Sequence, residues 1–168
     1  MRFRVTLPME ARKEMSLAYE CRLKPATGMP DQPAGVGAES RLNIDVVFTS
    51  VEATLAALKK AGALASRLNA RVTLLVPQVV PYPAPLTSPP VLLDFSERRF
   101  RVIAGECPVE TKVQLYLCRD AWETLSCALK PRSLVVIGGR ARWWPTREKR
   151  LAGKLRRAGH EVVFAEME

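Results

Sequence analysis

The sequence has little of what metal sites, disulfide frameworks and histidine-based catalysis require. Histidine occurs once, as His160, and the four cysteines, Cys21, Cys107, Cys118 and Cys127, include no CxxC pair. Zinc sites and disulfide-rich domains both need such residues at closer spacing. We therefore expect reduced, mostly buried cysteines, and we expect His160 to lie in a surface turn of RAGHEVV without a metal or a nucleophile.

Long apolar runs are also missing from the chain. No stretch approaches the roughly 18 to 20 consecutive apolar residues of a membrane span, and charges interrupt the N-terminus where a secretory signal has its apolar region. These absences predict a cytoplasmic protein without a membrane span. A chain of 168 residues with 48% hydrophobic content is long enough for one domain with a core.

The usual arrangements of catalytic residues are not found either. The acidic residues Asp45, Asp94, Glu97 and Glu106 are scattered, and no spacing brings two of them together. The glycine pair Gly138 and Gly139 lacks the GKS or GKT ending of a phosphate-binding P-loop. We expect a protein that binds rather than catalyses.

Residues 1–41 differ in composition from the rest of the chain. The stretch KPATGMPDQPAGVGAES is rich in proline, glycine and alanine and has no apolar periodicity, which is typical of a linker. We predict a flexible or loosely docked N-terminal extension over residues 1–41 and one folded domain over residues 42–168.

The folded part alternates short apolar runs with segments of helical periodicity. Strands are expected at NIDVVFTS, RVTLLVPQVV, TKVQLYLC, SLVVIGG and HEVVFAE. Four helical segments separate them, including a weaker one at 93–104. Strands that alternate with helices predict an α/β fold with an open, mostly parallel five-stranded sheet and helices on both faces.

Capping residues mark the ends of these helices. Thr49 and Glu52 match a capping box for the first helix, and Asn69 fits a left-handed position after it. Asp120 is the expected cap of the third helix. The last helix is expected to start after Thr146, to end at Gly159, and to bury a stripe of Leu151, Leu155 and Ala158.

Positive charge is concentrated in one segment of the sequence. Residues 140–157 contain eight basic residues and one acidic residue, so seven of the chain's nine net positive charges fall within 18 residues. Three interpretations stay open: a solvated helix face, an anion site at the start of the last helix, or a nucleic-acid or membrane surface with Trp143 and Trp144 beside it.

The passage ALASRLNARVTLLVPQVVPYP and the pattern VVIGGR…AGKLRRAGHEVVF carry a family likeness. Over roughly 43–166 the chain resembles the universal stress protein family. That resemblance implies a Rossmann-like sheet of strand order 3-2-1-4-5 and a nucleotide crevice at the carboxyl ends of the first and fourth strands. It implies a crevice lined by Phe48, Thr49, Ser50, Val76, Gly138, Gly139 and Arg140.

The sequence departs from the family's ATP motif at several positions. Thr49 stands where ATP-binding members carry an aspartate, and Ala141 replaces the second glycine of their phosphate motif. The late glycine, Gly153, is followed by Lys154 rather than by a hydroxyl residue. Charges on Arg140, Arg142 and Lys154 would compensate for amides lost from the motif, so ATP or another nucleotide remains a candidate ligand.

These observations predict a non-catalytic regulatory module of the stress response that senses a ligand at a degenerate nucleotide site. The alternatives are an ATP-binding and ATP-hydrolysing stress protein, and a nucleic-acid-binding protein that uses residues 140–157. The resemblance also makes the fifth strand an edge of the sheet. An apolar edge is available for pairing, so we predict a homodimer through Val162, Val163 and Phe164.

Overall fold

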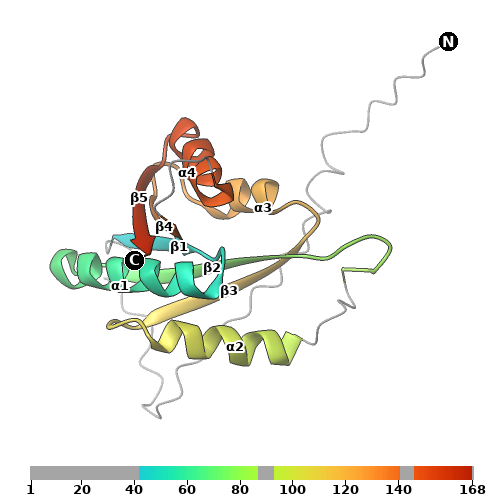
Figure 1. Ribbon diagram of the computed structural model, residues 1–168, viewed down its shortest axis with the longest axis horizontal. Helices are drawn as coiled ribbons and strands as arrows, with labels where there is room; N and C mark the ends of the chain where they lie inside the picture. The colour runs from blue at the N-terminus through green and yellow to red at the C-terminus, as the bar shows by residue number, and fades with distance from the viewer. Residues whose placement is uncertain (1–41, 87–92, 141–145, 168) are drawn as a thin grey trace, which may run out of the picture.

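The computed structural model describes residues 42–86, 93–140 and 146–167, which form one parallel sheet with four helices (Figure 1). The elements are β1 (Asn43–Val47), α1 (Val51–Leu68), β2 (Arg71–Val79), α2 (Leu93–Gly105), β3 (Thr111–Cys118), α3 (Ala121–Ala128), β4 (Leu134–Arg140), α4 (Arg147–Arg157) and β5 (Glu161–Met167). The strand order is β3-β2-β1-β4-β5. The predicted fold class and order are confirmed, while the predicted extension, 1–41, lies outside the described residues.

Helices cover both faces of the sheet. In Figure 1, α1 and α2 lie on one side and α3 and α4 on the other. Alternate residues of the central strand face the two layers: Ile44 and Val46 belong to the core under α1 and α2, and Val47 belongs to the core under α3 and α4. All three are fully buried, as expected for a strand at the centre of a parallel sheet. None of the helices formed by the described residues is long and apolar enough to span a bilayer.

Most of the predicted helix ends are confirmed. The Asp120 side chain caps α3 by accepting from the backbone N of Glu123 at 2.9 Å. Thr146 caps α4, and Asn69 adopts the left-handed conformation that ends α1, with φ 49° and ψ 41°. The residue types therefore encoded these boundaries locally.

Two local predictions were wrong by small shifts along the chain. Ser50, not Thr49, is the N-cap of α1: its hydroxyl accepts from the backbone N of Ala53 at 3.3 Å. Since β1 ends at Val47, Thr49 still belongs to the connection between strand and helix. In α4 the buried pair is Ala152 and Leu155, whereas Ala158 is exposed because the helix has already ended at Arg157.

The cysteines and the histidine lie largely as the sequence indicated. Cys118 is buried and Cys107 is half-buried, but Cys127 is exposed on α3, so the expectation of buried cysteines fails there. His160 lies half-buried in the turn before β5, with Nδ1 3.1 Å from the hydroxyl of Ser133. Cys21 lies outside the described residues.

The amino end of β1 holds a buried polar cluster. Asp45 is only 7% exposed, and its carboxylate accepts a hydrogen bond from Nδ2 of the Asn43 side chain; Oδ1 of the same side chain accepts from the Thr73 hydroxyl at 2.9 Å. Burial raises the pKa of Asp45 to about 6, although the hydrogen bond from Asn43 and the charge of Lys130 act in the opposite direction. Desolvation of the charged carboxylate therefore outweighs both favourable contacts.

Candidate functional site: a cleft between β1 and β4

The carboxyl ends of the five strands share one edge of the sheet, because all the strands are parallel. β1 pairs with β2 on one side and with β4 on the other. The connections from β1 to β2 and from β4 to β5 therefore leave this point in opposite directions along the sheet. In open α/β sheets such a switch point opens a crevice for ligands.

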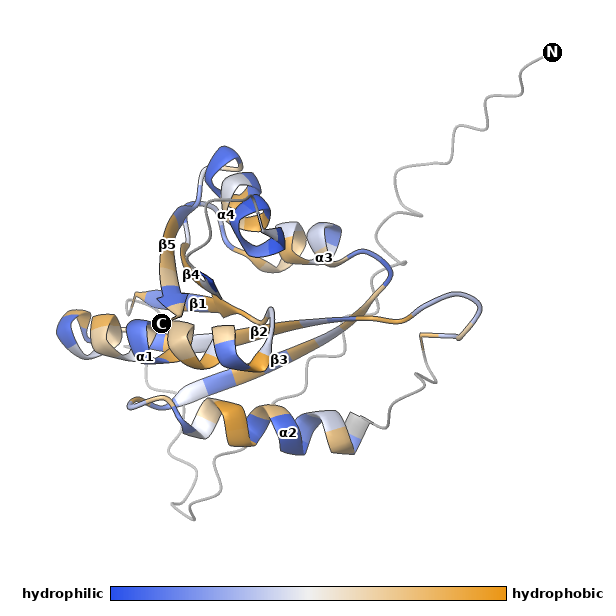
Figure 2. Ribbon diagram, in the orientation of Figure 1, coloured by the Kyte–Doolittle hydropathy of each residue, from blue (hydrophilic) through white to orange (hydrophobic). Residues whose placement is uncertain are grey.

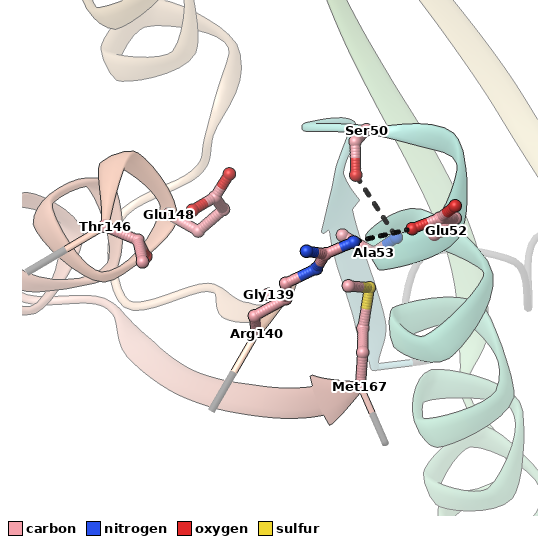
Figure 3. Close-up of a pocket in the computed structure, with 8 residues that line it drawn as sticks. All are labelled: Ser50, Glu52, Ala53, Gly139, Arg140, Thr146, Glu148 and Met167. Atoms are coloured by element: carbon pink, nitrogen blue, oxygen red, sulfur yellow. Dashed lines mark hydrogen bonds and ion pairs between the residues drawn. The ribbon is translucent and has the colours of Figure 1, made fainter. Parts of the chain in front are cut away.

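A cleft of about 330 Å³ lies at this switch point (Figure 3). Three segments line it: the start of α1, the end of β4 with the start of α4, and the end of β5. The lining residues are Ser50, Glu52, Ala53, Gly139, Arg140, Thr146, Glu148 and Met167. Its volume lies near the lower end of the range typical of small-molecule sites.

Two helices begin at the cleft. The caps of α1 and α4 are hydroxyl residues, Ser50 and Thr146, and each accepts from a backbone N three residues later at 3.3 Å. The first amides of a helix have no partner within the helix, and the helix dipole places partial positive charge at the same end. Two such ends at one cleft favour an anionic group.

Two of the three charged side chains that line the cleft form an exposed ion pair. Arg140 lies at the end of β4, and its Nη2 is 3.6 Å from Oε2 of Glu52 in the first turn of α1. Both side chains are well exposed, at 61% and 74%. Figure 3 shows Arg140 reaching toward Glu52, while Glu148 projects from α4 on the opposite side. An exposed pair of this kind contributes little to stability, so its partners remain exchangeable.

The two glycines of β4 serve packing. A Cβ on Gly138 would lie 1.7 Å from the carbonyl oxygen of Ala53, so the first turn of α1 rests directly on the strand at this point. A Cβ on Gly139 would lie 2.6 Å from Cζ of Phe164 and 3.0 Å from Cβ of Glu148. The absence of side chains brings both helix starts close to the end of β4, which forms the cleft.

Thr49 connects the two central strands below the cleft. Its hydroxyl donates to the carbonyl oxygen of Gly138 at 3.4 Å, and its backbone N lies 3.4 Å from the hydroxyl of Thr54. Thr49 occupies the position at which the resemblance implies an aspartate. A threonine there contributes a neutral hydroxyl that already has a partner, so it supplies no carboxylate for a ribose or a metal.

The structure brings three of the predicted site residues into the cleft: Ser50, Gly139 and Arg140. Thr49 and Gly138 adjoin them in the chain and act through the packing just described. Arg142 lies outside the described residues.

The other predicted site residues lie elsewhere. Phe48 is half-buried and packs edge-on against Phe100 of α2, with ring centroids 4.9 Å apart. Val76 is 1% exposed and belongs to the core under α1 and α2. Gly153 and Lys154 do not line the cleft, and Nζ of Lys154 lies 5.4 Å from the ring centroid of Trp122.

Sequence reasoning missed the acidic residues of the cleft, Glu52 and Glu148. Each lies in the first turn of a helix that follows one of the two switch-point strands, and this shared position was the signal that could have identified them. Met167 at the end of β5 was missed as well. Within the described parts of the chain no three Asp, Glu, Cys or His residues gather as metal ligands would.

The topology and the cleft define an open α/β protein of the Rossmann-like class with a cleft at the switch point. No protein-family model matches the sequence, and no curated protein matches it significantly. A member of the universal stress protein family from Burkholderia pseudomallei has a similar structure, with a TM-score of 0.52, 19% identity, and coverage of 74% of this chain and 96% of that one. A universal stress protein in complex with cAMP matches with a TM-score of 0.49 and 15% identity over the same shares of the two chains. The similarity to the Burkholderia pseudomallei protein shows that the chain has the fold of universal stress proteins, which confirms the resemblance in fold.

Proposed function

We propose that this protein is a non-catalytic, cytoplasmic regulatory module that binds a small phosphate-bearing ligand, such as a nucleotide, in the cleft between β1 and β4. The observation that carries this proposal is the convergence of two helix starts and Arg140 on the switch point. Backbone amides and a guanidinium together provide the donors that a phosphate group needs.

The acidic residues of the cleft define how such a ligand binds. With Glu52 and Glu148 present, the three charged lining residues carry a net charge of −1. A phosphate group therefore has to displace Glu52 from Arg140 before it gains that guanidinium as a partner. Because the ion pair has to break first, we expect moderate affinity. Ligands with many negative charges are disfavoured, since the cleft itself carries a net negative charge.

Isothermal titration calorimetry with ATP, ADP, cAMP and a cyclic dinucleotide tests the proposal. We expect heat of binding from at least one of them and a loss of at least tenfold in affinity for Arg140→Ala. Arg67→Ala removes an exposed arginine at the opposite end of α1 and should leave the affinity unchanged. No heat from any of the four compounds, or an equal effect of the two substitutions, would contradict a phosphate site in the cleft.

The proposal that the module is non-catalytic has its own test. Purified protein at micromolar concentration should release no more phosphate from ATP with magnesium than the Arg140→Ala variant does. Turnover that depends on Arg140 would favour the ATP-hydrolysing alternative.

We propose further that two copies associate through β5. Its outer edge has no neighbouring strand among the described residues, and Val162, Val163 and Phe164 along it are half-buried rather than exposed. Unpaired edges of this length commonly pair with another chain. Light scattering should give the mass of a dimer at micromolar concentration and that of a monomer for Val163→Pro, because proline cannot donate to a strand pair. A wild-type mass that stays monomeric across the concentration range would exclude the dimer.

A further inference from the structure

The outer face of α4 carries a row of basic residues that the cleft does not use. Arg147, Arg150, Lys154 and Arg157 are all exposed, and none of them lines the cleft. At 3.6 residues per turn they fall within an arc of about 80° on the side opposite Ala152. The row is about 15 Å long, at 1.5 Å per residue. We refer to these four residues as the α4 row, and Figure 2 shows the hydrophilic character of this helix.

The α4 row is unfavourable for the stability of its own helix. Neighbours in it are three or four residues apart, where like charges repel by about 0.2–0.5 kcal/mol per pair. Arg147 also lies at the first helical position, next to the positive end of the helix dipole. Among the described residues, Arg147, Arg150 and Arg157 have no acidic partner that would compensate. The one acidic residue of α4, Glu148, faces the cleft instead.

An ordinary solvated helix face explains only part of this pattern. Cations in the last turn, such as Arg157, stabilise the negative end of the dipole. Alternating signs of charge are typical of a solvated helix face with salt bridges, and that alternation is missing from the α4 row. Lysines and arginines that cluster along one face of a helix are typical of a surface that binds nucleic acid.

We propose that the α4 row binds the phosphate backbone of a nucleic acid, independently of the ligand in the cleft. Nucleic acid carries one phosphate per 3.4 Å of axis on each strand, so a row of about 15 Å can contact several phosphates at once. Lys154 is held in the row by the face of Trp122 on α3. The described residues include no exposed large apolar side chain on α3 or α4, whereas a helix that lies in a membrane interface needs one.

The experiment compares two triple substitutions in the full chain. Arg147→Gln, Arg150→Gln and Arg157→Gln together remove three charges from the α4 row. The control, Arg98→Gln, Arg99→Gln and Arg101→Gln, removes three exposed arginines from α2 on the other face of the sheet. Fluorescence anisotropy with labelled 20-nucleotide DNA, single-stranded and duplex, gives the affinity of each protein between 50 and 200 mM salt.

We expect the α4 triple variant to lose at least tenfold in affinity for duplex DNA at 50 mM salt, and the α2 control to lose less than twofold. For four contacts the logarithm of affinity should fall with the logarithm of salt with a slope of about −3.5, and the variant's slope should be about −1. The corresponding Arg→Lys triple variant should restore the wild-type slope, which separates loss of charge from misfolding.

Three results would overturn the proposal. They are equal losses in both triple variants, no DNA binding by the wild-type protein at 50 mM salt, and binding of polyglutamate or of phosphatidylserine vesicles that equals DNA binding and depends on the α4 row. The cleft is tested separately, because Arg140→Ala should leave DNA affinity within twofold of wild type.

Discussion

The polar contacts near the two ends of β1 differ in their exposure to water. At the amino end, Asp45 is buried and hydrogen-bonded within the cluster of Asn43 and Thr73. At the carboxyl end, Glu52 and Arg140 form an ion pair that is mostly exposed to water. The fold fixes the first set of contacts, whereas solvent or a ligand can replace the second. Of these two sets of polar groups, the one at the carboxyl end can change partners without disturbing the core, which supports the proposal of a ligand site there.

The largest expected effect concerns the glycine that brings α1 onto β4. Gly138→Ala places a methyl group 1.7 Å from the carbonyl oxygen of Ala53, where only backbone movement can relieve the clash. We expect the free energy of unfolding to fall by about 3 kcal/mol or more. Urea denaturation followed by circular dichroism measures the change.

A second glycine provides the matched control. Gly153 lies inside α4, and a Cβ there would meet no atom within 4 Å. Gly153→Ala should therefore stabilise the protein by about 0.5–1 kcal/mol through helix propensity. Equal destabilisation by both substitutions would contradict the role assigned to Gly138.

The next effect concerns the buried carboxyl group at the amino end. Because burial raises the pKa of Asp45 to about 6, the folded protein binds a proton more tightly than the unfolded chain does. The stability that this proton confers is fully present below about pH 4 and is lost as the pH rises through about 6. Asp45→Asn removes the ionisation, and the variant should be more stable than wild type by about 2–3 kcal/mol at pH 8.

Thermal unfolding of both proteins between pH 4 and pH 8 checks this expectation. The two melting temperatures should converge toward pH 4 and separate as the pH rises. A constant difference across the range would mean that Asp45 does not titrate in the folded state near pH 6. Glu161→Gln, at an exposed position, serves as the control. Its melting temperature should follow that of the wild-type protein at every pH.

A smaller effect distinguishes the two hydroxyl residues before α1. Ser50→Ala removes the cap and should destabilise the protein by about 1 kcal/mol. Thr49→Ala removes only a long hydrogen bond to Gly138, 3.4 Å between oxygens, and should cost about half as much. Chemical denaturation measures the loss in the free energy of unfolding for each variant. A larger loss for Thr49→Ala than for Ser50→Ala would mean that Thr49 is the cap.

Much of the fold could be predicted because its signals are local. The β-branched runs set the strands, and Asp120, Thr146 and Asn69 set helix ends. The cap of α1 was missed by one residue because both Thr49 and Ser50 suit the position, and only the end of β1 decides between them. Ala158 was expected in the core because the periodicity was continued past the last turn of α4.

The candidate site was harder to predict because it depends on distant contacts. The position of the cleft followed from the strand order that the resemblance implied, but only three of its lining residues did: Ser50, Gly139 and Arg140. Val76 and Phe48 belong to the core, while Glu52 and Glu148 reach the cleft from helices about 100 residues apart. The sequence singled out the glycine pair for a phosphate, and the structure shows a packing role for it as well: Gly138 lies against the first turn of α1 and Gly139 lies against Phe164.

The most direct test of the cleft compares the ADP affinity of the wild-type protein with that of Glu52→Gln by calorimetry. If a phosphate group displaces Glu52 from Arg140, the substitution should tighten binding by up to about fivefold, the equivalent of one exposed ion pair. Glu123→Gln, in the first turn of α3, should leave the affinity unchanged. Tighter binding by the Glu52 variant alone is the result that the account predicts. Weaker or unchanged binding would contradict an exchange of partners at Arg140.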